Sequence, residues 1–160
     1  QVVADGLCFP NGSFITPDGK TLIVNETFAN RISEFDIEPN GVLGPRRDWA
    51  NFGELPDSDD LATLIAASKI APDGGALDEE GALWVGDAIG KRIVRVERGG
   101  RILEQIDTGE FGIFAAALGG ADGRTLFMAA APDFVEANRR AKPQARILTT
   151  QVDVPHAGRP

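Results

Sequence analysis

The chain has 160 residues, of which 16 are Lys or Arg and 24 are Asp or Glu, so its formal net charge is −8 at pH 7. This charge argues against a nucleic-acid partner, whose phosphates need a basic surface, and against an anionic membrane surface. One cysteine and one histidine exclude an internal disulfide, a multi-thiolate metal site and a three-histidine zinc site. Any metal must therefore be held mainly by oxygen atoms.

The 19 glycines and 10 prolines recur at spaced turns, which is typical of a chain built from many short strands. No apolar run approaches the ~18 residues of a membrane span, and no signal-peptide pattern is present. We therefore expect a cytoplasmic protein. Because the chain begins with Gln1 and not with methionine, the sequence does not exclude a signal peptide that has been removed.

One pattern occurs in three copies along the chain. Each copy has an apolar stretch, a tight-turn dipeptide, a second apolar stretch and then a strand that opens with Arg-Ile. The copies extend over residues 10–37, 72–97 and 114–152, and their turn dipeptides are Asp18-Gly19, Glu80-Gly81 and Asp122-Gly123. Glycine in these dipeptides supplies the positive φ of a turn between antiparallel strands. A further strand is expected near 46–52 and 101–107, which gives four antiparallel strands per unit and predicts β-propeller blades.

The predicted fold is all-β, with a six-bladed β-propeller architecture of which this chain supplies about three four-stranded blades. Three blades cannot close a ring, since propellers have about four to eight. The expected boundaries are residues 1–6 as the outer strand of a preceding blade, 7–52 as a blade, 53–70 as an insertion, 71–109 as a second blade and 110–160 as the last blade, with a loop insertion at 131–145. In the first insertion, Asp57, Ser58 or Asp59 could cap a short helix.

The ordered set of motifs resembles the carboxy-terminal half of the gluconolactonase, regucalcin (senescence marker protein) and luciferin-regenerating enzyme family. The matching residues are Pro10-Asn11-Gly12 with 17–22, Asp36, Pro45-Arg46-Arg47, Pro72-Asp73-Gly74 with 81–85, and 118–127. The resemblance implies a six-bladed propeller with one divalent cation in its axial channel, Ca²⁺ first, with Zn²⁺, Mn²⁺ or Mg²⁺ as alternatives. It also implies hydrolysis of lactones or related esters.

Within that resemblance, Asn11 and Asp73 fall on two of the family's metal ligands, and Asp73 also falls on its general base. No residue matches the family's glutamate ligand or its further pocket asparagine. The repeat supports the same pair, since Asn11 and Asp73 both stand directly before the first strand of a blade, at the end where the loops of one face emerge. A carbonyl and a carboxylate are suitable ligands for a hard cation. The third copy has Ala115 at this place, which cannot ligate.

Three further residues are candidates for substrate binding. Glu26 and Asp87 occupy equivalent places after the second strand of a blade, where they could approach a metal or substrate or simply be solvated loop carboxylates. Arg139, in the 131–145 insertion, could grip an anionic substrate at the channel mouth or belong to a solvated face.

The resulting hypothesis is a metal-dependent hydrolase that opens a sugar lactone or related cyclic ester, with water activated by Asp73. The alternatives are a non-catalytic half-propeller that serves as a binding or assembly module, and a strictosidine-synthase-like propeller that would not require the Asn11 and Asp73 pair. The expected partners are a small-molecule lactone or ester and, for the unpaired strand edges, the missing half of the propeller or a second copy of the chain.

Overall fold

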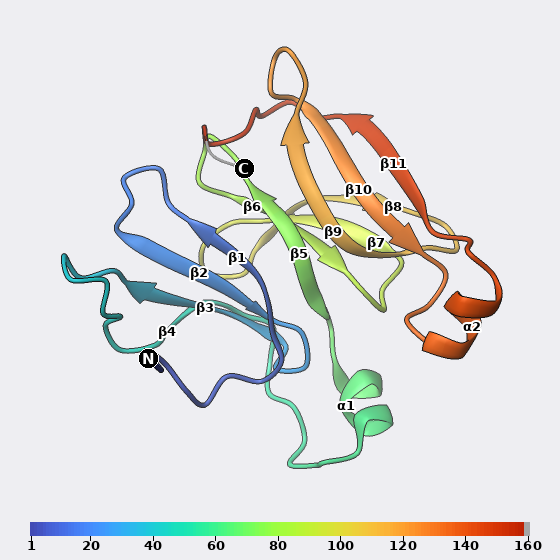
Figure 1. Ribbon diagram of the computed structural model, residues 1–160, viewed down its shortest axis with the longest axis horizontal. Coiled ribbons are helices and arrows are strands. Elements are labelled where there is room, and N and C mark those ends of the chain that lie inside the picture. Colours follow the sequence, from blue (N-terminus) through green and yellow to red (C-terminus); the bar gives the residue numbers. More distant parts are fainter. Residues whose placement is uncertain (159–160) are drawn as a thin grey trace.

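The strands pair in the order in which they follow one another, each antiparallel to the next. In the computed structural model, which describes residues 1–158, they form three separate sheets (Figure 1). The first sheet holds β1 (Pro10–Ile15), β2 (Thr21–Glu26), β3 (Arg31–Asp36) and β4 (Arg47–Asn51); the second holds β5 (Pro72–Leu77), β6 (Leu83–Asp87), β7 (Arg92–Val96) and β8 (Ile102–Asp107); the third holds β9 (Gly112–Gly119), β10 (Thr125–Ala131) and β11 (Arg146–Gln151). The prediction of an all-β chain made of propeller blades is confirmed.

The turns between the first and second strands of each sheet have the predicted chemistry. Gly19, Gly81 and Gly123 adopt φ values of 73°, 78° and 72°, in the left-handed region that favours glycine. The N–H of each glycine donates to the carbonyl oxygen three residues earlier, at 2.8, 3.0 and 3.2 Å respectively. The three dipeptides therefore close the same turn in each blade.

The second sheet is the centre of the molecule, because its strands β5, β6 and β7 are largely buried on both faces, while its outer strand β8 is mostly exposed. Side chains alternate between the two faces of a strand, so Leu83 and Val85 on β6 pack toward the first sheet while Trp84 packs toward the third. All five residues of β6 are buried. A strand covered on both sides reads as a continuous apolar run, which is what its sequence shows.

The inner strands β1, β5 and β9 lie side by side, and glycine permits their close approach. A Cβ atom at Gly12 on β1 would lie 2.6 Å from the carbonyl oxygen of Asp73 on β5. A Cβ at Gly74 would lie 2.7 Å from the Cα of Ala115 on β9. These glycines let the backbones meet at the start of the inner strands, where the candidate residues lie.

Both insertions contain a short helix, α1 (Leu61–Ala67) and α2 (Glu136–Ala141). The residue that caps α1 differs from the prediction. It is Asp60, whose Oδ2 accepts from the backbone N–H of Thr63 at 2.9 Å, and not Asp57, Ser58 or Asp59. The helix begins at Leu61, so the residue directly before it, Asp60, is the N-cap, and it has the extended backbone that a cap requires. Among the described residues, no helix is long and apolar enough to cross a membrane.

The expected outer strand at residues 1–6 does not form within this chain, because residues 1–7 adopt no regular secondary structure. A strand needs a neighbour to satisfy its backbone groups, and within residues 1–158 no strand pairs with this segment. Val2 and Val3 remain 80% and 46% exposed. Within the described part of the chain, β11 likewise has β10 on one side and no strand on the other.

Candidate functional site

Asp73 is a buried carboxylic acid at the start of β5. The residue is 9% exposed, and this burial raises the pKa of the Asp73 carboxyl to about 6, with only the backbone N–H of Gly74 acting in the opposite direction. Desolvation disfavours the charged form of an acid, so the proton is held more tightly than in water. A group poised near neutral pH is suited to accept and return a proton.

Asn11 lies on the neighbouring inner strand and is joined to the Asp73 segment through Thr27. The Asn11 Nδ2 donates to the Thr27 Oγ1 at 3.4 Å, and this hydroxyl donates in turn to the carbonyl oxygen of Pro72 at 2.9 Å. Because the amide nitrogen of Asn11 faces Thr27, its Oδ1 is directed away from that hydroxyl. The structure thus places the two predicted metal-site residues on adjacent strands, linked by one side chain.

A second side chain from β2 holds the backbone at Asp73. The Nδ2 of Asn25 donates to the carbonyl oxygen of Asp73, and Asn25 is fully buried. Its Oδ1 has no hydrogen-bond partner among the described residues. Sequence reasoning missed Asn25 and Thr27, although an amide directly after the apolar run 22–24 was a signal that could have been used.

Asp73 also forms part of the wall of a small cavity of about 110 Å³, here named the phenylalanine cavity. Its lining residues come from all three blades and are Phe9, Thr27, Phe28, Asp73, Ala88, Ile89, Phe114 and Phe134. The rings of Phe9 and Phe28 pack against each other with centroids 4.9 Å apart. Phe134 belongs to the 131–145 insertion, so that insertion reaches the predicted site.

Glu26 and Asp87 are neither substrate-facing nor solvated, and both expectations for them are corrected by their burial. Glu26 accepts from Arg31 Nε and Nη2, both at 2.9 Å, and from the backbone N–H of Cys8. Burial alone would raise the pKa of Glu26, but these hydrogen bonds and one from Ser33 outweigh it and lower the pKa.

Asp87 repeats this arrangement in the next blade. Its Oδ2 accepts from Arg92 Nε at 2.9 Å, and its Oδ1 accepts from the backbone N–H groups of Ala71 and Gly90. Both carboxylates therefore use their oxygens in hydrogen bonds that connect the end of the second strand to the third strand and the adjoining loops. They are structural residues.

Arg139 is likewise engaged within the chain. It lies in α2, and its Nε and Nη2 donate to the two oxygens of Asp133 at 3.1 and 3.2 Å. Burial alone would raise the pKa of the Asp133 carboxyl, but the hydrogen bonds from the Val135 N–H and from Asn138, together with the Arg139 guanidinium, outweigh it and lower the pKa. An anionic substrate would have to compete with Asp133, which weakens the role expected for Arg139.

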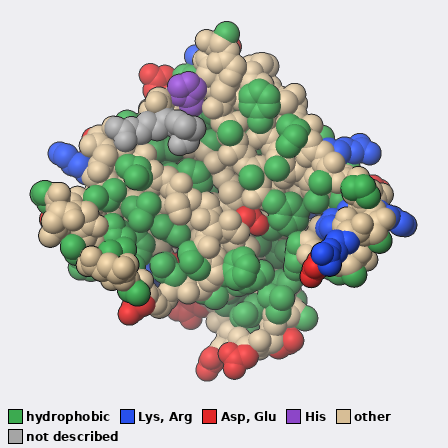
Figure 2. Space-filling model, in the orientation of Figure 1, with side chains coloured by type: hydrophobic (Ala, Val, Ile, Leu, Met, Phe, Trp, Pro, Cys, Tyr) green, Lys and Arg blue, Asp and Glu red, His purple; other side chains and the backbone are tan. Residues whose placement is uncertain are grey.

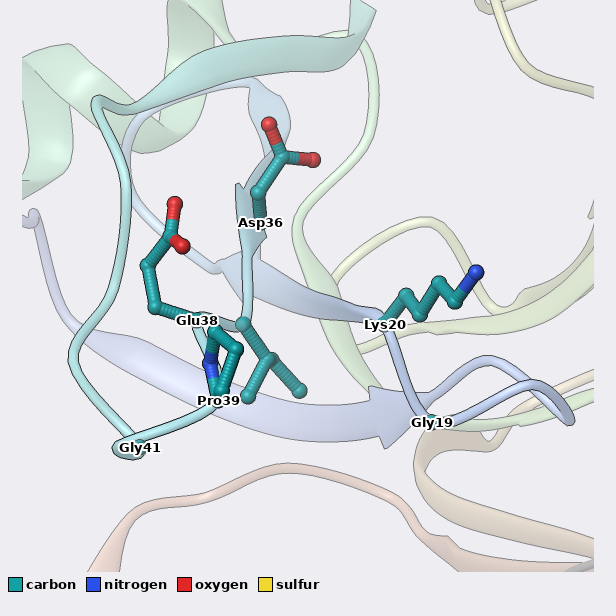
Figure 3. A pocket seen from close by; sticks show the side chains of 7 residues that line it. Gly19, Lys20, Asp36, Glu38, Pro39 and Gly41 are labelled. Carbon is teal, nitrogen blue, oxygen red and sulfur yellow. The ribbon is translucent and has the colours of Figure 1, made fainter.

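A larger hollow lies elsewhere on the molecule. It measures about 670 Å³ and is lined by Gly19, Lys20 and residues 36–39 and 41, at the far end of β1 from Asn11. Figure 3 shows the Lys20 ammonium pointing away from both Asp36 and Glu38. The Asp36 carboxylate is bound by Arg47 at 2.6 and 2.7 Å. The charged side chains that line this hollow do not point toward one common position, so we do not consider it a candidate catalytic site.

Asp73 and the neighbouring Asn11 offer the type of donor atom that a hard divalent cation prefers. Asn11 Oδ1 and the Asp73 carboxylate are oxygen donors of the type that Ca²⁺ and Mg²⁺ prefer. Within residues 1–158 there is no cluster of three or more His, Cys, Asp or Glu side chains that could hold a metal. The protein oxygens that this chain offers are therefore an amide and a carboxylate on neighbouring strands.

The three sheets have the form of β-propeller blades, with a buried acid and an amide where two of the inner strands begin. The chain belongs to the family described as "SMP-30/Gluconolactonase/LRE-like region", whose sequence model matches residues 1–132. The predicted resemblance is confirmed.

Individual relatives agree with this family. The chain is 25% identical over its whole length to a 6-deoxy-6-sulfogluconolactonase from Pseudomonas putida, of which it covers 52%. It is 34% identical over 86 residues to the human serum paraoxonase/arylesterase 1, a match that spans 54% of this chain and 20% of that protein. The chain thus spans about half the length of the first of these relatives and less of the second.

Solved structures show the same fold. A luciferin-regenerating enzyme superposes with a TM-score of 0.74 at 20% identity, covering 98% of this chain and 49% of that one. A regucalcin from Agrobacterium tumefaciens, described as a calcium-binding protein, gives 0.65 at 22% identity and 94% and 47% coverage. A gluconolactonase from Xanthomonas campestris gives 0.60 at 28% identity and 82% and 38% coverage.

Proposed function

We propose that this chain forms the part of a lactone hydrolase that carries its general base. The observation that carries the proposal is Asp73, a buried carboxyl with a pKa raised to about 6, set beside Asn11 and open to a cavity. Membership of the gluconolactonase-like family and the likeness to a sulfogluconolactonase support a lactone as substrate.

In this proposal Asp73 takes a proton from a water molecule as the water oxygen attacks the lactone carbonyl carbon. The bond between that carbon and the ring oxygen then breaks. The ring oxygen receives the proton from Asp73, and the product is an open-chain hydroxy acid. Thr27 and Asn25 position Asp73 by holding the carbonyl oxygens of Pro72 and Asp73 itself.

Asn11 and Asp73 would hold the divalent cation, with Ca²⁺ first and Zn²⁺, Mn²⁺ or Mg²⁺ as alternatives. When bound, the cation supplies Lewis-acid polarisation of the lactone carbonyl. The remaining ligands would come from water or from outside this chain, since no residue matches the family's glutamate.

Lactone hydrolysis with and without a chelator tests the proposed function. We expect acid release from gluconolactone or dihydrocoumarin in the presence of Ca²⁺, a loss of at least about tenfold with EDTA, and recovery when Ca²⁺ returns. Asn11→Ala should lower the apparent Ca²⁺ affinity. The control is Asn40→Ala, in an exposed turn where the amide bonds only to the Val42 N–H.

The possible results of this experiment lead to different conclusions. Hydrolysis that EDTA does not affect would remove the metal from the proposal. No hydrolysis of either lactone, with Ca²⁺ bound or not, would favour the alternative of a non-catalytic half-propeller.

We also propose that the open edge of β11 takes up a strand from outside the folded chain: residues 1–4 of a second copy or a further blade. Unpaired strand edges are templates for association, and the exposed Val2 and Val3 offer an extended apolar segment. Light scattering of the isolated chain should therefore give the mass of a dimer at micromolar concentration. Deleting residues 1–4 should restore a monomer. A well-folded monomer of the unmodified chain would contradict the exchange.

A further inference from the structure

We propose that the substrate of this site is a lactone with an apolar group, such as a fused aromatic ring or a short alkyl chain, and not a polyhydroxylated sugar lactone. The part of this inference that concerns hydrolysis rests on the proposed function, whereas the part that concerns binding of an apolar group does not. Its basis is the phenylalanine cavity, which opens beside the carboxyl of Asp73.

The cavity has almost no hydrogen-bonding capacity left. Its polar side chains are Thr27 and Asp73, and the Thr27 hydroxyl already accepts from Asn11 and donates to the carbonyl of Pro72. Each hydroxyl of a sugar ring that entered would lose its bonds to water without gaining partners, which costs free energy. An apolar ring loses nothing of this kind and gains from leaving water.

The aromatic side chains around the cavity are arranged for contact with a ligand. Phe9 and Phe134 lie far apart in the sequence, and both line the cavity. Their side chains are 59% and 49% exposed. Phe9 is also held with a φ of 53°, an unusual backbone for a side-chain-bearing residue, while its carbonyl oxygen accepts from the Thr27 N–H. Figure 2 shows hydrophobic side chains around a small acidic group near the middle of one face.

The volume of the cavity limits what enters. At about 110 Å³ it is smaller than the roughly 150 Å³ apolar cavity that accommodates benzene in an engineered protein. A single ring therefore enters it only in part, with the remainder against the exposed Phe9 and Phe134 and the ester bond at the Asp73 end. This size favours a small apolar lactone over a long acyl chain.

A matched pair of lactones separates the two substrate classes. Dihydrocoumarin and gluconolactone have the same lactone ring size, but one carries a fused benzene ring and the other carries hydroxyl groups. We expect the full chain with Ca²⁺ to hydrolyse dihydrocoumarin with the higher kcat/KM. Binding is measured separately by calorimetry with β-tetralone, a ketone that has the shape of dihydrocoumarin but no ester bond.

Phe134→Ser should weaken β-tetralone binding about tenfold, because it removes an aromatic contact from the cavity at a position that is 49% exposed. The control is Phe127→Ser, since Phe127 is 39% exposed on β10 and does not line the cavity. This variant should bind as the unmodified chain does.

The outcomes distinguish this inference from the proposed function. Binding of β-tetralone that depends on Phe134, without hydrolysis of any lactone, would support the inference and refute the proposed function. Preferential hydrolysis of gluconolactone, unchanged in Phe134→Ser, would overturn the inference and leave the function standing. Absence of β-tetralone binding would also overturn the inference.

Discussion

Replacing Asp73 with asparagine is expected to abolish lactone hydrolysis and, at neutral pH, to make the fold more stable. The amide has nearly the same volume but cannot accept a proton, and losing a general base costs about 10²–10⁴-fold in rate. Stability should rise because burial disfavours the ionised carboxylate, which raises its pKa from 3.8 to about 6. A pKa shift of this size corresponds to a gain in unfolding free energy of at most about 3 kcal/mol. The partial exposure of the carboxyl makes the expected gain smaller.

The pH dependence of unfolding tests whether Asp73→Asn stabilises or destabilises the fold. The Asp73 carboxyl has a higher pKa in the folded chain than in the unfolded chain, so the folded state binds more protons between about pH 4 and 6. The free energy of unfolding therefore falls as pH rises through this window and is lowest above it. In urea unfolding with EDTA present, Asp73→Asn and the unmodified chain should be equally stable at pH 4, and the variant should be more stable at pH 8.

A control variant removes the same charge from the surface. Asp59 is exposed and forms no side-chain hydrogen bond in the structure, so Asp59→Asn should leave both hydrolysis and unfolding unchanged at either pH. An Asp73→Asn variant that turns over lactone at a near-normal rate would remove this carboxyl from the mechanism. A variant less stable than the unmodified chain at pH 8 would show that Asp73 is ionised and compensated in the fold.

The blades could be predicted because their determinants are local. Asp18-Gly19 and the equivalent dipeptides set the turns through the backbone freedom of glycine, and strands that follow one another pair with their neighbours. The positions of Asn11 and Asp73 followed from the repeat, since equal places in neighbouring blades lie at the same end of the inner strands. The resemblance to the family added the metal-ligand and general-base roles proposed for them, which the repeat alone does not give.

The surroundings of Asp73 could not be predicted, because they depend on contacts between distant residues. Asn25 reaches the Asp73 carbonyl from 48 positions away, and the phenylalanine cavity combines residues from strands and loops of three blades. The helix cap is a different case, since Asp57, Ser58, Asp59 and Asp60 are all capable of capping. Which of them does so depends on where the helix begins, and sequence alone leaves that open by a residue or two.

The misassignment of Glu26 and Asp87 had a readable signal. Each carboxylate is followed five positions later by the arginine that opens the third strand, Arg31 or Arg92, and in the hairpin the two residues of each pair lie directly opposite one another. The same register in the third blade sets Ala130 against Arg146, whose guanidinium lies 5.0 Å from the centre of the Phe111 ring. The third blade thus keeps the arginine without the acid, and its guanidinium lies over an aromatic ring instead.

Arg31→Ala is therefore expected to be among the most destabilising single substitutions in this chain. It leaves the fully buried Glu26 carboxylate without its cation, and removing one partner of a buried ion pair typically costs about 3–5 kcal/mol. Urea unfolding at pH 8 measures this loss. Arg101→Ala is the control, because the pair of Arg101 with Glu97 has side chains 72% and 38% exposed and such pairs contribute about 0–1 kcal/mol.

Acid conditions should partly rescue Arg31→Ala, and this response distinguishes an uncompensated charge from lost packing. In the unmodified chain the pKa of Glu26 is lowered, so its contribution to stability is present above the unfolded value of 4.5 and is lost as pH falls through the lower folded value. In the variant, burial acts on Glu26 without Arg31, and protonation at mildly acidic pH relieves the cost. The difference in unfolding free energy between variant and unmodified chain should shrink from pH 8 to pH 5. A difference that stays constant over this range would mean that Arg31 stabilises the blade by packing and not by charge.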